Sequence, residues 1–68
     1  MDYLINKNSD DNGRNEVHKT SCSYLPEQQN QISLGSHTSD ENALAYAKLL
    51  GWKTADGCYY CCPRIHKG

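Results

Sequence analysis

Hydrophobic positions are sparse along this chain and fall into short runs separated by polar turns. Runs of β-favouring or alternating residues predict strands over 3–7, 16–18 and 31–34. The first two are expected to pair as a hairpin, because the cluster 8–13 between them is rich in Asn, Asp, Ser and Gly. The third strand is expected to end at Gly35.

One helix is predicted over about 39–50. Thr38 and Glu41 have the spacing of a capping box, in which the threonine accepts from the third amide and the glutamate reaches back. Gly51 suits the left-handed position that closes a helix. Small and apolar residues recur on one face at helical spacing: Ala43, Leu44, Ala47 and Leu50.

The predicted core is thin. Hydrophobic residues make up 37% of the 68 residues and there is no Phe. Its expected members are Leu4, Ile5, Val17, Leu25, Ile32, Leu34, Leu44, Leu49, Leu50 and Trp52, with Ile32 and Leu34 on one face of their strand. In chains this short, apolar burial barely offsets chain entropy, and natural examples add disulfides or a metal. The sequence therefore predicts a covalent or metal staple.

A metal-ligand pattern meets this need. His18-x3-Cys22 and Cys58-x2-Cys61 together supply three cysteines and one histidine, the donor set of a closed tetrahedral zinc site. His66 is an alternative fourth ligand, since Cys61-x4-His66 is also acceptable zinc spacing. We expect a structural Zn²⁺ ion held by His18 or His66 and the three cysteines.

These elements define the expected fold class. The chain should form a single α+β domain, residues 1–68, with a three-stranded antiparallel sheet, one helix and a C-terminal zinc knuckle over 58–63. Asp56-Gly57 is interpreted as the turn that delivers Cys58 to the knuckle.

Whether the cysteines bind a metal or form disulfides depends on the redox state of the compartment in which the protein resides. The first residues lack a basic region followed by an apolar run, and no stretch approaches the ~20 apolar residues of a membrane span. We therefore expect a cytoplasmic protein, whose clustered cysteines stay reduced and bind metal. Two disulfides in one of three pairings are the alternative, although bridging the adjacent Cys61 and Cys62 separately is awkward.

The motif resembles a group of small bacterial zinc modules. These are related to the metal-binding domain of the Ada DNA-repair protein and to short modules appended to some bacterial nucleases. The matching residues are Val17-His18, Cys22, Leu25, Glu41-Asn42-Ala43, Cys58, Cys61 and Pro63. The resemblance implies a zinc site of three cysteines and one histidine, and its spacing favours His18 over His66. Ada holds zinc with four cysteines, so its methyl-acceptor activity is not carried over.

The remaining chemistry is limited. No catalytic set is visible, so we expect no enzyme. Cys62 is interpreted as a small buried residue beside the knuckle. The alternatives are that Cys62 is a redox or nucleophilic centre assisted by the nearby Arg64, or that it replaces Cys61 as a metal ligand. His37 is expected to be exposed or to cap the helix, and Glu16 to be solvated at the hairpin tip.

The expected function is a monomeric binding or interaction module, with an unknown protein partner and no membrane. The alternative is a nucleic-acid-associated accessory protein that stacks bases on a C-terminal surface. The residues of that surface would be Tyr59, Tyr60, Arg64, His66 and Lys67, with Trp52 and Lys53. Seven basic against eight acidic residues give a net charge of −1, which supplies no strong field for phosphates.

Overall fold

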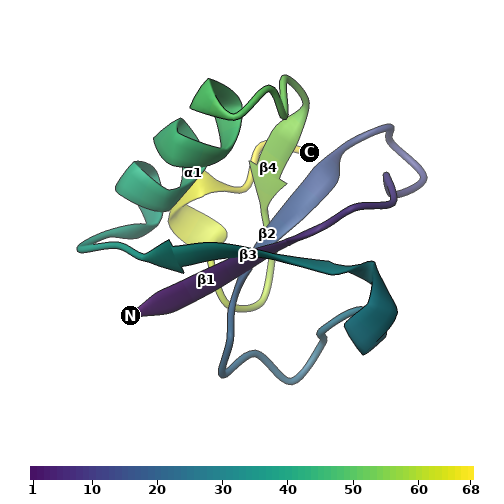
Figure 1. Ribbon diagram of the computed structural model, residues 1–68. Coiled ribbons are helices and arrows are strands. Elements are labelled where there is room, and N and C mark those ends of the chain that lie inside the picture. The colour runs from purple at the N-terminus through teal and green to yellow at the C-terminus, as the bar shows by residue number, and fades with distance from the viewer.

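A four-stranded sheet and one α-helix make up the fold. The computed structural model describes residues 1–68. The elements are β1 (Asp2–Asn6), β2 (Asn15–Lys19), η1 (Gln28–Asn30), β3 (Gln31–Ser36), α1 (Asp40–Leu49), β4 (Ala55–Gly57) and η2 (Pro63–Ile65), where η marks a 3₁₀ turn. Figure 1 shows α1 and the C-terminal segment gathered beside β4, while the loop after β2 extends on the other side of the sheet.

The strand order is β3-β1-β2-β4. β1 pairs antiparallel with β2 and with β3, which confirms the predicted hairpin. β4 pairs parallel with β2, so the predicted three-stranded antiparallel sheet is wrong: the sheet is four-stranded and mixed. Asp56 and Gly57, interpreted as a turn, belong to β4. This strand has three residues and no β-branched side chain, so its sequence carries no strand signal.

The third strand differs from its prediction in two ways. Gly35 does not end β3; it lies within the strand with φ 78°, at an irregularity in the pairing with Tyr3 and Leu4. Leu34 is buried as expected, but Ile32 is 39% exposed. Ile32 pairs with a buried residue of β1, yet β3 is an edge strand, so nothing from a further strand covers its outer side.

The N-cap of the helix lies one residue after the predicted cap, Thr38. Ser39 is the N-cap, and its hydroxyl accepts a hydrogen bond from the Asn42 N–H at 3.1 Å. The Thr38 hydroxyl accepts from the Asn42 side-chain amide instead, at 2.6 Å, so Thr38 and Glu41 do not form the predicted capping box. Gly51 has φ 107°, which confirms a left-handed residue just after the helix.

The core lies between α1 and the sheet and is built from smaller residues than predicted. Leu49 and Leu50 are 81% and 53% exposed, so their placement in the core is wrong. Ala43 and Ala47 are fully buried, which lets the helix backbone approach the sheet closely. The core cluster consists of Tyr3, Ile5, Val17, Leu34, Ala43, Ala47, Ala55, Cys62 and Ile65.

Close packing of β4 against η2 gives a stability prediction. A Cβ on Gly57 would lie 2.6 Å from the Cys62 carbonyl oxygen and closer still to Ile65. We therefore expect Gly57→Ala to lower the free energy of unfolding by about 1–3 kcal/mol, through overpacking. Denaturant unfolding measures this. Gly68→Ala is the control, because its Cβ would meet only the Arg14 side chain; equal stability of both variants would contradict the prediction.

Candidate metal centre

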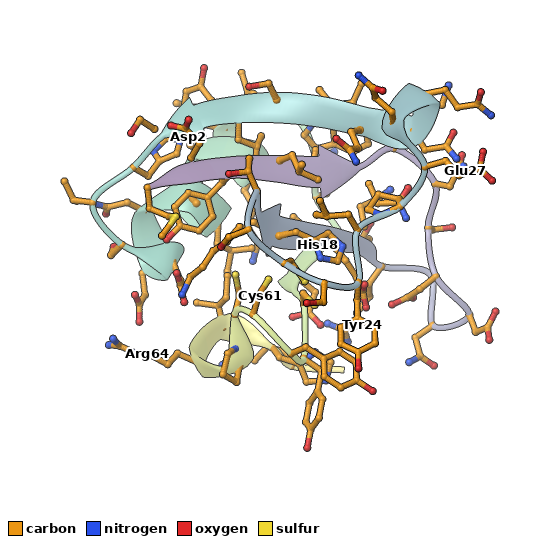
Figure 2. The ribbon with its side chains drawn as sticks, turned by 90° about the horizontal axis from the view of Figure 1, so that it is seen from below. Asp2, His18, Tyr24, Glu27, Cys61 and Arg64 are labelled. Atoms are coloured by element: carbon orange, nitrogen blue, oxygen red, sulfur yellow. The ribbon has the colours of Figure 1, made fainter.

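Four side chains from distant parts of the chain meet on the face of the sheet opposite α1. The ligand atoms of His18, Cys22, Cys58 and Cys61 all lie within 4.8 Å of one another. His18 comes from β2, Cys22 from the turn after it, and the other two from the segment after β4. Figure 2 shows His18 and Cys61 reaching toward each other from the sheet and the C-terminal segment. The four residues with the predicted ligand spacing are therefore brought together.

The parallel pairing of β2 with β4 explains why Cys58 reaches the cluster. Val17 pairs with Gly57, and the Cys58 N–H donates to the Val17 carbonyl at 2.9 Å. Cys58 therefore follows β4 directly alongside His18. The strand that sequence reasoning missed is the element that places this cysteine.

Two tight turns position the remaining thiols. The Cys22 N–H donates to the Lys19 carbonyl at 3.0 Å, and the Cys62 N–H donates to the Cys58 carbonyl at 2.9 Å. Backbone amides also point at sulfur: the Lys19 N–H donates to Cys61 Sγ and the Tyr24 N–H to Cys22 Sγ, each at 3.3 Å. Both amide donors belong to the segment from the end of β2 through the turn after it, so this segment supplies hydrogen bonds to one sulfur of each turn.

His18 carries the clearest sign that the cluster can hold a metal ion. The residue is 1% exposed, and its Nδ1 atom has no hydrogen-bond partner. A buried polar atom without a partner costs about 1–3 kcal/mol, and such atoms are rare in native proteins. Burial also lowers the pKa of His18, which favours the neutral imidazole that binds metals. The Nδ1 atom therefore has the burial, the protonation state and the free lone pair that a metal donor needs.

Glu16 completes the surroundings of His18. Its Oε1 atom lies 3.5 Å from His18 Nε2, on the side of the ring away from the unpartnered Nδ1. A carboxylate facing the second ring nitrogen favours the Nε2–H tautomer and leaves Nδ1 free to bind. Sequence reasoning placed Glu16 at a solvated hairpin tip. Its position two residues before His18, on the same face of β2, was the available signal.

The sulfur geometry fits a tetrahedral ion. Cys22 Sγ and Cys58 Sγ are 3.9 Å apart. Two sulfurs of a tetrahedral site with Zn–S bonds of about 2.3 Å are separated by roughly 3.8 Å. All four cysteines are unpaired, so the structure contains no disulfide. Burial raises the pKa of Cys61, so metal binding must displace its proton.

His66, the alternative fourth ligand, lies outside the cluster. Its Nδ1 atom is 2.9 Å from the Gly57 carbonyl oxygen and 3.5 Å from an Asp56 carboxylate oxygen. His66 therefore has polar partners of its own, whereas His18 Nδ1 has none. This contrast favours His18 as the fourth donor.

Cys62 and His37, which the sequence analysis also considered, lie outside the cluster of four side chains. Cys62 is fully buried in the core cluster, as interpreted, although its Sγ lies 3.6 Å from Cys61 Sγ. Its burial, which also raises its pKa, opposes a reactive thiolate. His37 Nε2 lies 2.7 Å from the Leu34 carbonyl oxygen, outside the cluster.

The predicted C-terminal surface is only partly assembled. Tyr59 and Tyr60 are each 62% exposed. Trp52, however, packs against the core cluster, and Arg64 forms an ion pair with Glu41 of α1 at 3.1 Å. In Figure 2, Arg64 extends to the opposite side of Cys61 from Tyr24. Trp52 and Arg64 therefore do not join the two exposed tyrosines in one surface.

Comparisons of this chain with protein-family models, with curated proteins and with solved structures found no match. The resemblance to Ada-related zinc modules stays a prediction from motif spacing. No helix could cross a bilayer, since α1 has only ten residues.

The contrast between the two histidines is directly testable. We expect His18→Ala to lower zinc affinity more than about a hundredfold and to abolish cooperative folding, because it removes one of the four side chains that would bind the metal directly. His66→Ala should keep both, apart from a small loss of stability. Chelator competition and circular dichroism measure the two quantities. A His18→Ala protein that retains metal and fold would overturn the assignment.

Proposed function

We propose that this chain is a structural-zinc module that acts by binding a partner. The observation that carries the proposal is the buried, unpartnered His18 Nδ1 beside three thiols within 4.8 Å. A bound ion would satisfy the nitrogen, and its two positive charges would offset the negative charge that the thiols acquire when it displaces their protons. The unsatisfied nitrogen is a costly feature of the metal-free fold.

Zinc is the metal that this donor set favours. Three sulfurs and one imidazole are soft to borderline ligands, and the short Sγ–Sγ contact between Cys22 and Cys58 suits tetrahedral geometry. The spacing resembles that of the bacterial Ada-related modules, which supports the same ion.

The metal's role is proposed to be structural because four protein ligands complete its shell. Catalytic zinc sites keep one position for water or substrate. With His18 in place of a fourth cysteine, the thiolate charge on the metal is lower and a methyl-acceptor role is disfavoured. We infer no enzymatic activity, and a cytoplasmic setting would keep the thiols reduced.

With catalysis disfavoured, the role we propose for this small domain is to bind another macromolecule through its surface. The nucleic-acid alternative draws on the exposed Tyr59 and Tyr60, since bases stack on aromatic rings. Against it stand the net charge of −1 and the engagement of Arg64 with Glu41. Binding to a protein partner is therefore the proposal we favour.

Native mass spectrometry tests the metal proposal. Under reducing conditions we expect one zinc ion per chain and four cysteines without disulfides. A chelator should remove the ion, and Cys62→Ala should keep the stoichiometry, because Cys62 lies in the core. Cys58→Ala should lose the ion. A wild-type mass that corresponds to two disulfides and no metal, in freshly reduced and refolded protein, would contradict the proposal.

A further inference from the structure

An ordered set of aromatic side chains lies beside the cysteine/histidine cluster. Tyr24, Tyr59 and Tyr60, here called the tyrosine ledge, are 59%, 62% and 62% exposed. The Tyr24 and Tyr60 rings stack with centroids 4.0 Å apart and planes 21° apart. Tyr59 meets Tyr60 edge-on at 5.3 Å and 84°. Figure 2 shows Tyr24 on the side of the molecule opposite β3.

The same segments that form the cluster also form the ledge. Tyr24 follows Cys22 by two residues, and Tyr60 lies between Cys58 and Cys61. A metal that joins the two segments would hold the stacked rings in place before any ligand arrives. Preorganised rings lose little conformational entropy on binding. Three adjoining exposed aromatic rings on so small a surface mark an interaction site.

A hollow of about 430 Å³ adjoins the ledge and has little net charge. Tyr24 and Tyr60 line it together with two serines, Ser21 and Ser23, and with two cysteines of the cluster, Cys22 and Cys61, so the hollow opens onto the cluster itself. Its one charged side chain is Lys19, whose Nζ lies 3.9 Å from an Asp40 carboxylate oxygen. No carboxylate lines the hollow, and three thiolates on a divalent ion would leave a net charge of −1 next to the lysine.

This chemistry selects the occupant. A nucleic acid requires several cations along its phosphates, and the hollow offers one that is already near a carboxylate. Tyrosine faces and hydroxyls suit a neutral ligand with compact apolar rings and free carbonyl acceptors. A polyproline II segment has both, because its backbone makes no internal hydrogen bonds. Aromatic-lined grooves are the usual surface for such peptides.

We propose that the tyrosine ledge and its hollow bind a proline-rich peptide in the polyproline II conformation. Proline rings lie against Tyr24 and Tyr60, and the tyrosine and serine hydroxyls donate to peptide carbonyls. The inference rests on the proposed function, since the metal is what joins the two segments that carry the ledge.

The probe is an acetylated, amidated decaproline titrated into the reduced, zinc-loaded full chain and followed by NMR shifts. We expect saturable shifts around residues 21–24 and 58–61. Tyr60→Ala should weaken binding at least tenfold, because it removes both the stacked and the edge-on contact. Tyr24→Ser is the second variant, should the first fail to fold. Tyr46→Ala on α1, at a tyrosine that is 39% exposed and lies outside the ledge, should change affinity less than twofold.

The other outcomes are decisive. Zinc-loaded, folded protein that does not bind decaproline overturns this inference and leaves the zinc proposal standing. A chain that folds without zinc and binds the peptide equally well overturns the dependence on the metal. Tighter binding of oligothymidine that is lost in Lys19→Ala overturns it in favour of a nucleic acid. Equal weakening by Tyr46→Ala and Tyr60→Ala places the peptide elsewhere.

Discussion

Everything in this structure depends on holding the C-terminal segment against β2. Fifteen of the 68 residues are buried, three of the nine residues in the core cluster are alanines, and its one aromatic side chain is Tyr3. β4 contributes only three residues of pairing. The proposed metal, held by His18 and Cys22 on one side and by Cys58 and Cys61 on the other, would clamp this weak junction. Structural zinc can contribute about 10 kcal/mol or more to folding.

The clamp and the core occupy opposite faces of the same strand. Val17 faces the helix and is fully buried, whereas His18 faces the cluster and is 1% exposed. Cys61 and Cys62 repeat this division one residue apart, one in the cluster and one in the core. The proposed metal and the hydrophobic core would therefore reinforce each other through adjacent residues, and loss of either should loosen both.

Sequence reasoning recovered the features that have local signals. The hairpin, the helix and its closing glycine follow from turn residues and from periodicity, and the four clustered side chains follow from motif spacing. It missed β4, because Ala55, Asp56 and Gly57 have no strand propensity and their pairing with β2 is parallel and non-local. The capping error between Thr38 and Ser39 was a shift of one residue, which propensities cannot resolve.

The surroundings of the cluster were the least predictable part. Glu16 beside His18, and Tyr24 stacked on Tyr60, arise from tertiary contacts between segments far apart in the sequence. Leu49 and Leu50 were misplaced because a short helix over a small sheet buries only its narrow alanine face.

Circular dichroism of the reduced protein during zinc removal and return tests the central claim most directly. The account predicts that a chelator unfolds the chain and that one equivalent of zinc restores the folded spectrum. A reduced, metal-free protein that keeps its spectrum and a cooperative thermal transition would contradict it.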